Sequence, residues 1–393
     1  MRNFFAERMN NLLPSGIRKV NEKALEMERN GEKVIHFEIG RPDFDTPDYI
    51  KKEGINSIKR GEVFYTSNFG DMELRKEIAK SLSKRQKTEY EPEEILATVG
   101  LSEAIFDLLG AILDEGDEIL VPDPVWINYV NVPKFFRACP VTYNLVEENN
   151  YQLDLNEIKE KITEKTKAIV IISPNNPTGG VLSRDTLEGI ADIAKKNDLL
   201  VISDEVYNRI VFDDSQCESI VTIPGMKERT LLLNGFSKAY SMTGWRLGYV
   251  AANKEFIMQF NKIHQHNVIC APSFVQKAAI VALRDETNEV DEMVWEYKRR
   301  RDYAVNAINS IDGISCKTPG GAFYIFINIK ELEIKSEEAA DYLLDKEKIA
   351  LVPGSVFGTN GEGYLRMSFA NSYENIVEGC NRLKKGIESL RHR

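Results

Sequence analysis

The sequence is poor in the residues that build disulfide frameworks and metal centres. It has five cysteines in 393 residues, without a C-x-x-C pair, and four histidines, without an H-E-x-x-H motif. A chain of this length can bury a large hydrophobic core and does not need disulfides for stability. We therefore expect no disulfide framework and no zinc or other metal site, as is typical of a protein from a reducing cytoplasm.

Long hydrophobic runs and excess positive charge are also missing. No run approaches the ~20 apolar residues of a membrane span, and residues 1–15 lack the apolar core of a signal peptide. Acidic residues outnumber basic ones by 61 to 51, which gives a net charge of −10. Nucleic acids and anionic membranes demand a basic face, so we expect neither as a partner and predict a soluble cytoplasmic protein.

What the sequence does contain is a regular alternation of short apolar runs and helical segments between Glu94 and Ala252. Continuous apolar runs are expected for strands whose two faces are both covered by helices. The pattern predicts an α/β domain with a mainly parallel sheet. The predicted strands are Ile95–Val99, Glu118–Val121, Lys167–Ile172, Leu199–Ile202, Thr230–Leu233 and Leu247–Ala251.

The pattern changes near residue 286. A long charged helix, Glu289–Ile311, precedes a mixture of strands and helices that is typical of a smaller α+β lobe. A helix near Ile17–Asn30 could pack on this lobe. We therefore predict a large domain over residues 46–285 and a small domain made of 1–45 and 286–393. The later predicted elements are strands at Ala322–Asn328, Ile349–Val352 and Tyr364–Phe369, and helices near Ser336–Lys346 and from Tyr373.

Polar clusters follow the strand ends, where open α/β sheets bind their ligands. Each has an ordinary explanation by itself, since Ser102 or Asp204 could cap a helix and Lys238 could be a solvated loop lysine. Their convergence at one sheet edge favours a binding site. The clusters are Gly100–Ala104, Ser173–Gly180, Ser203–Tyr207 and Asn234–Arg246.

Pyridoxal 5'-phosphate is a cofactor whose needs these clusters meet together. It requires a lysine for its aldehyde, an acid for its ring nitrogen, donors for its phosphate and a flat partner for its ring. An acid after a strand also occurs in nucleotide hydrolases, but those need G-x-x-x-x-G-K-[ST], and the sequence has no Gly-Lys pair. The matching residues are Lys238, Asp204, Ser102 with Ser237 and Arg246, and Trp126.

Several longer strings carry a family resemblance. They are Gly40-Arg41-Pro42-Asp43-Phe44-Asp45-Thr46-Pro47, Ser173–Gly179, Asp204–Tyr207, and Ser237-Lys238 followed by Gly244–Gly248. With them the chain, from about residue 13 to 390, resembles the fold-type I pyridoxal-phosphate enzymes of aminotransferase class I/II, especially the bacterial aspartate aminotransferase-like branch. The resemblance implies a mainly parallel seven-stranded sheet flanked by helices, a smaller α+β domain and an active homodimer.

The resemblance also implies catalytic roles. Lys238 would form the Schiff base with the cofactor and shuttle the proton. Asp204 would pair with the ring nitrogen, Tyr207 and Asn176 would hold the ring 3'-oxygen, and Trp126 would stack on the ring. Trp126 and Asn176 would also contact the substrate.

Further implied roles concern the phosphate and the substrate carboxylate. Arg366 would clamp the substrate α-carboxylate beside the main chain of Gly40, and Tyr65 would reach the phosphate of the neighbouring subunit. The phosphate donors of the same subunit would be Leu101, Ser102, Ser237 and Arg246.

The departures from the family pattern concern the substrate side chain. Residues 264–271, where animal-type aspartate enzymes carry a second arginine, contain none, and Ser102 stands where some bacterial relatives have a lysine. Arg41 replaces a glutamate found in many relatives and could supply positive charge near the entrance. The donor therefore stays open between aspartate-type, broad and aromatic amino acids.

Three functions remain at this point. The first is an amino acid:2-oxo acid aminotransferase with two half-reactions and 2-oxoglutarate as the expected acceptor. The second is a carbon–sulfur β-lyase on the same fold, which would use the same lysine and clamp. The third is a cofactor-binding regulatory module, which the acidic charge and the lack of room for a DNA-binding extension disfavour.

Overall fold

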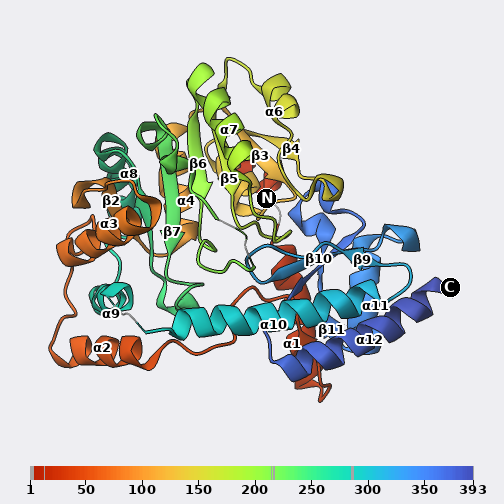
Figure 1. Ribbon diagram of the computed structural model, residues 1–393. Coiled ribbons are helices and arrows are strands. Elements are labelled where there is room, and N and C mark those ends of the chain that lie inside the picture. Colours follow the sequence, from red (N-terminus) through yellow and green to blue (C-terminus); the bar gives the residue numbers. More distant parts are fainter. Residues whose placement is uncertain (1–3, 13, 214, 216, 285–286, 393) are drawn as a thin grey trace.

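A seven-stranded sheet forms the centre of the computed structural model, which describes residues 4–392 except 13, 214, 216, 285 and 286 (Figure 1). Its strand order is β2-β8-β7-β6-β5-β3-β4. Strand β8 pairs antiparallel with β2 and with β7, and the other four pairs of these strands are parallel, so the predicted mainly parallel sheet is confirmed. The strands are β2 (Ile95–Thr98), β3 (Glu118–Asp123), β4 (Cys139–Asn144), β5 (Thr166–Ile172), β6 (Leu200–Asp204), β7 (Thr230–Gly235) and β8 (Gly248–Ala251).

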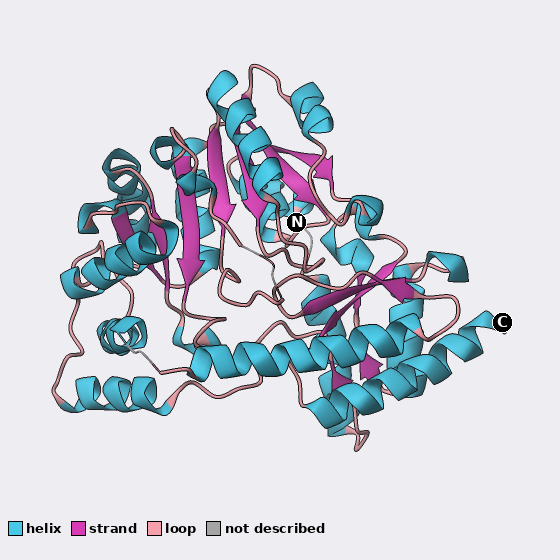
Figure 2. Cartoon of the chain, viewed as in Figure 1, coloured by secondary structure: helices cyan, strands magenta, loops and turns pink. Residues whose placement is uncertain are grey.

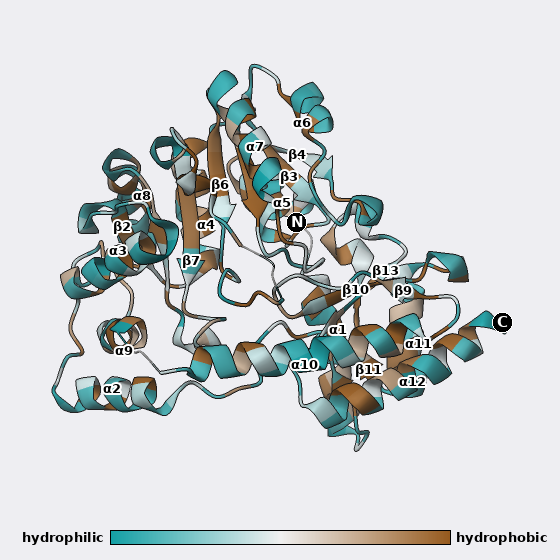
Figure 3. Ribbon diagram, viewed as in Figure 1, coloured by the Kyte–Doolittle hydropathy of each residue, from teal (hydrophilic) through white to brown (hydrophobic). Residues whose placement is uncertain are grey.

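Helices cover both faces of this sheet, as the strand arrows enclosed by helices in Figure 2 show. Successive strand residues point to opposite faces. Thus Val170 and Ile172 of β5 pack in one buried cluster with α4 (Leu101–Ile112) and α8 (Lys254–Asn267), and Ile169 and Ile171 pack in another with α7 (Arg184–Lys196). Burial on both sides is the reason why the central strands β5, β6 and β7 are largely apolar, and Figure 3 shows β6 and β7 mostly in brown.

The helices around the sheet begin and end as follows: α2 (Asp48–Lys59), α3 (Met72–Gln86), α4 (Leu101–Ile112), α5 (Asn128–Phe135), α6 (Leu155–Lys161), α7 (Arg184–Lys196), α8 (Lys254–Asn267) and α9 (Ser273–Arg284).

A second group of elements contains a four-stranded antiparallel sheet, β12-β13-β10-β9, and a parallel pair, β1 and β11. Helix α10 runs as one long rod toward this group (Figure 1). Ion pairs from Lys19 and Lys23 of α1 to Glu337 and Asp341 hold α1 against α11. The elements are α1 (Gly16–Arg29), β1 (Ile35–His36), α10 (Glu289–Asn309), β9 (Ser315–Cys316), β10 (Tyr324–Asn328), α11 (Ser336–Glu347), β11 (Ile349–Ala350), β12 (Val352–Pro353), β13 (Tyr364–Ser368) and α12 (Tyr373–Arg391).

Two features of the large sheet were not among the predicted elements. Strand β4 lies at its edge and is only partly buried, so it lacks a continuous apolar run. The antiparallel direction of β8 follows from its pairing with β2 and β7, which no local pattern reveals. Among the described residues, no helix is both long enough and apolar enough to cross a membrane.

Candidate active site

A cavity of about 410 Å³ lies beyond the ends of the parallel strands, and the predicted site residues other than Tyr65 meet there. Asp204 ends β6, Ser237 and Lys238 follow β7, and residues of the second group close the opposite side. A larger cavity of about 800 Å³, beside α1 and α11, contains none of the predicted residues. The predicted residues that line the smaller cavity are Gly40, Leu101, Ser102, Trp126, Asn176, Asp204, Tyr207, Ser237, Lys238, Arg246 and Arg366.

Asp204 is a buried carboxylate with defined partners. Its Oδ2 accepts a hydrogen bond of 2.8 Å from the hydroxyl of Tyr129, and its Oδ1 accepts one of 3.2 Å from the Val206 amide. Burial raises the pKa of Asp204 to about 6, although these hydrogen bonds oppose the rise. The carboxylate is therefore ionised at neutral pH and faces the cavity as its one lining acid among the described residues.

Lys238 presents an amine that is easier to deprotonate than an ordinary lysine. Burial, and then the charges of Arg366 and Arg246, lower its pKa to about 8. Its Nζ donates a 2.5 Å hydrogen bond to the carbonyl of Gly40 and lies 5.7 Å from the ring centre of Tyr207. A desolvated lysine near neighbouring cations is the usual form of an amine that reacts with a carbonyl carbon.

Arg366 is held at the other side of the cavity with only 1% of its surface exposed. Its Nη1 donates to Oδ1 of Asn176 at 3.0 Å, and its Nη2 donates to the carbonyl of Glu38. The guanidinium lies 4.5 Å from the ring centre of Tyr324. No acid pairs with Arg366 among the described residues, so its charge is available to a carboxylate ligand.

The end of the cavity near α4 is built for an anion. Gly100 precedes the helix with φ of +77°, and no side chain caps the helix there. A Cβ at Gly100 would lie 2.5 Å from Nη2 of Arg246, so glycine allows the guanidinium to approach the helix start. Free amides at a helix N-terminus attract phosphate, and Ser102 and Ser237 add hydroxyls on the same lining.

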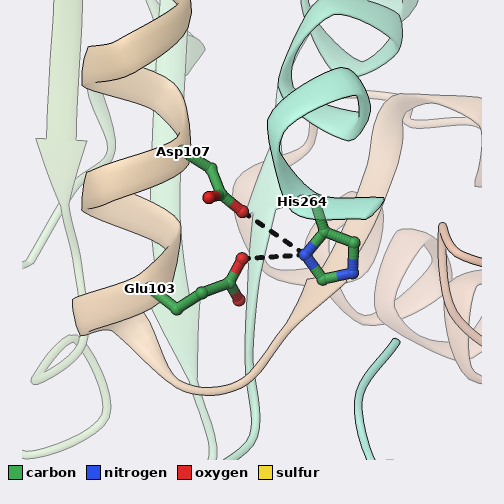
Figure 4. A group of neighbouring side chains, drawn as sticks. All are labelled: Glu103, Asp107 and His264. Carbon is green, nitrogen blue, oxygen red and sulfur yellow. Dashed lines mark hydrogen bonds and ion pairs between the residues drawn. The ribbon is translucent and has the colours of Figure 1, made fainter. Parts of the chain in front are cut away.

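Behind this helix start lies a buried cluster of three titratable groups (Figure 4). Nδ1 of His264, on α8, lies 2.8 Å from Oε1 of Glu103 and 3.3 Å from Oδ2 of Asp107, both on α4. Oε2 of Glu103 accepts a 2.7 Å hydrogen bond from the Val99 amide, next to Gly100. Burial raises the pKa of Glu103 to about 7.

The spacing of these three groups would also suit metal ligands, because one ligand atom from each lies within 4.8 Å of the others. No metal motif in the sequence indicates this cluster, since His264 is 161 residues from Glu103. The hydrogen bonds of Glu103 with His264 and with the Val99 amide join α8 to the loop before α4, whereas Oδ2 of Asp107 and Nε2 of His264 are buried without a hydrogen-bond partner among the described residues.

Tyr65 is the one predicted site residue that does not line the cavity. Its side chain is 81% exposed, as is that of Phe64. Five other lining residues, in contrast, had no role predicted from the sequence, namely Ile17, Ile172, Val206, Thr243 and Tyr324. Tyr324 shares a 2.7 Å hydrogen bond between hydroxyls with Tyr207, and Ile17 of α1 adds apolar surface.

Tyr129, which bonds Asp204, was also missed. It lies three residues after Trp126, whose carbonyl accepts a 3.1 Å hydrogen bond from the Tyr129 amide in the turn that leads into α5, so that spacing was the available signal.

The donors present fit pyridoxal 5'-phosphate. A buried acid, an amine of lowered pKa and an anion site line one cavity, and a second guanidinium, which pairs with no acid among the described residues, can attract a substrate carboxylate. This site, on a seven-stranded α/β sheet with a second antiparallel sheet across the cavity, defines an enzyme of the aminotransferase type.

Comparisons with known proteins agree. Residues 32–383 match the family model "Aminotransferase class I and II", and the chain belongs to this family, whose members generally depend on pyridoxal phosphate. It is 43% identical to an aspartate aminotransferase of Pyrococcus abyssi over 97% of both chains, and 38% identical to aromatic-amino-acid aminotransferase 2 of Thermococcus litoralis over 98% of both. The solved aspartate aminotransferase of Thermus thermophilus with maleate superposes with a TM-score of 0.93 at 33% identity, covering 98% of this chain and 100% of that one.

The protein is therefore an aminotransferase. The predicted fold class and enzyme class are confirmed, and the comparisons do not favour the β-lyase alternative. The regulatory-module alternative is wrong.

Proposed function

We propose that the protein transfers the amino group of an amino acid to 2-oxoglutarate in two half-reactions, with pyridoxal 5'-phosphate attached to Lys238. The observation that carries the proposal is the meeting of Lys238, Asp204 and Arg366 in one cavity, although 162 residues separate Asp204 from Arg366 in the sequence. When bound, the cofactor supplies an electron sink for negative charge at the substrate Cα.

The cofactor-binding residues contact different parts of the cofactor. Asp204 pairs with the ring nitrogen, and Tyr129 keeps the carboxylate ionised and oriented. Trp126 covers the ring, and Tyr207 with Asn176 holds its 3'-oxygen. The phosphate binds at the start of α4, where Leu101, Ser102, Ser237 and Arg246 supply donors.

The substrate takes the place of contacts that its binding residues make with one another. The planar fork of Arg366 binds the α-carboxylate with two parallel hydrogen bonds, next to Gly40 and Asn176. Lys238 then carries a proton between the substrate Cα and the C4' carbon of the cofactor. Its pKa near 8 suits both the loss and the gain of that proton at neutral pH.

The proposal includes a homodimer in which Tyr65 completes the partner's phosphate site. Its exposure on one chain, beside the equally exposed Phe64, supports this, because large apolar side chains in a group are usually covered. Light scattering should give twice the chain mass. Tyr65→Phe should weaken cofactor binding a few-fold without dissociating the dimer.

The proposal also includes the cellular location and the division into domains. All five cysteines are free thiols, which supports a cytoplasmic protein. The pairing of β1 with β11 supports the assignment of residues 1–45 and 286–393 to one small domain. The predicted boundary at residues 285 and 286 lies outside the described residues.

A spectral titration tests the function. The absorbance of lysine-bound cofactor should disappear when an amino acid is added and return when 2-oxoglutarate follows. Lys238→Ala should show neither change, whereas Lys254→Ala, at the exposed start of α8 and outside the cavity lining, should behave as wild type. Failure of the cycle with aspartate, alanine, aromatic and branched donors would contradict the proposal.

A further inference from the structure

The cavity holds more positive charge than the proposed cofactor and α-carboxylate contacts use. Four cationic side chains line it: Lys238, Arg246, Arg366 and Arg41. The first attaches the cofactor, the second faces its phosphate and the third binds the α-carboxylate. Arg41 is left without a ligand group.

The guanidinium of Arg41 is not paired with another group in the described part of the chain. Its side chain is exposed and forms no hydrogen bond or ion pair with any residue in the described part of the chain. It also borders a neighbouring cavity of about 610 Å³ that contains three acids. Those acids already have cationic or titratable partners, in the pairs Glu28–His36 (3.2 Å), Asp43–Arg300 (2.8 Å) and Asp45–Lys51 (2.6 Å).

The backbone fixes where Arg41 stands. The preceding residue, Gly40, accepts the hydrogen bond from Lys238, so Arg41 follows directly on the segment that touches the reacting amine. The lining of the same cavity includes Ile17 and Trp126, which offer apolar surface to substrate methylene groups. The lining acid, Asp204, accepts a hydrogen bond from Tyr129 and forms no ion pair with Arg41 among the described residues.

We propose that Arg41 binds the distal carboxylate of dicarboxylic substrates, namely glutamate, 2-oxoglutarate and aspartate. The inference rests on the proposed function, because it names the substrate class of that site. Arg41 supplies, from the same subunit, a positive charge that residues 264–271 and Ser102 do not supply. A guanidinium suits a carboxylate because its donors form a planar fork.

The test compares Arg41→Gln with a matched control, Arg18→Gln. Arg18 is also exposed, adjoins the lining residue Ile17 and does not itself line the cavity, so the control removes the same charge nearby. Half-reaction rates with glutamate and aspartate are measured against those with phenylalanine and alanine. Maleate, a dicarboxylate without an amino group, and propionate are titrated by calorimetry.

Arg41→Gln should lower kcat/KM for glutamate and aspartate, and the affinity for maleate, by about 10- to 100-fold, the range of a charge-assisted hydrogen bond. Values for phenylalanine, alanine and propionate should change less than about two-fold, and Arg41→Lys should recover part of the loss. Arg18→Gln should resemble wild type.

Equal losses for dicarboxylic and neutral ligands, no loss of maleate affinity, or an equal effect of Arg18→Gln would overturn the inference. If wild type reacts with no amino acid, the proposed function itself fails. The maleate titration still decides whether Arg41 binds a second carboxylate.

Discussion

Tyr129 should set the protonation of Asp204, and removing its hydroxyl is the sharpest test of the electrostatics of the site. The 2.8 Å hydrogen bond from Tyr129 favours the ionised carboxylate, whose pKa burial has raised to about 6. A hydrogen bond to a charged group contributes about 1.5–3 kcal/mol, and one pKa unit corresponds to about 1.4 kcal/mol. Tyr129→Phe should therefore raise the pKa of Asp204 by ~1–2 units, to ~7–8.

Cofactor affinity reports this shift, because only the ionised form of Asp204 attracts a protonated ring nitrogen. Affinity should fall as the pH is lowered through the pKa of Asp204, and in Tyr129→Phe the fall should begin ~1–2 pH units higher. The assay is equilibrium dialysis of pyridoxal phosphate from pH 5.5 to 9, in a Lys238→Ala background that removes lysine titration. Titration of the cofactor itself is common to both proteins and cancels in the comparison.

Tyr143→Phe is the matched control. Tyr143, on β4, is equally buried, and its hydroxyl donates to the backbone carbonyl of Val170 at 2.6 Å, away from the lining of the cavity. Its affinity curve should superimpose on that of the parent. Superimposable curves for Tyr129→Phe, or an equal displacement by Tyr143→Phe, would refute the reasoning.

Three other outcomes follow from the site. Covalent loading of cofactor-free protein, measured by absorbance, should rise with pH around an apparent pKa near 8, because Lys238 must be neutral to react. A midpoint near pH 10.5 would contradict the effect of burial on the pKa of Lys238. Despite burial, the carboxylates of Asp107 and Glu103, which pair with the protonated imidazole, raise the pKa of His264 to about 9, so its stabilisation is complete below pH ~6.5 and is lost as the pH rises through 9. The free energy of unfolding, measured with urea, should therefore fall on the order of 3 kcal/mol over that pH window, and the fall should be much smaller in His264→Gln. The same dependence of this free energy on pH in both proteins would exclude the effect. Arg366→Lys keeps the charge but loses the fork, so kcat/KM for every donor should fall at least ~10-fold while cofactor affinity is unchanged, and a loss of cofactor binding would instead indicate a structural role.

The sequence predicted those parts of the site that are local in the chain. Asp204 and Lys238 were found because each directly follows an apolar strand, and parallel strands bring their ends to one edge. Gly100 before α4 and Ser102 in its first turn indicated the anion site for the same reason. Their roles came from the family resemblance, which requires several residues at once.

Contacts between distant segments were beyond the sequence. The hydroxyl pair of Tyr207 and Tyr324 joins residues 117 apart, and nothing near either tyrosine indicates the other. His264 reaches Glu103 only because α8 packs beside α4. Strand β4 was missed because an edge strand needs no continuous apolar run.

The backbone carbonyls of Glu38 and Gly40 have a consequence for how ligands arrive. They hold Arg366 and Lys238 in place before any ligand binds, yet a neutral carbonyl orients a cation without cancelling its charge. The protein thus carries a net charge of −10 while the cationic residues of its cavity attract anions locally. Low-dielectric walls focus such a field, so anionic cofactor and substrates should be captured faster at low ionic strength, against the repulsion expected from the acidic surface.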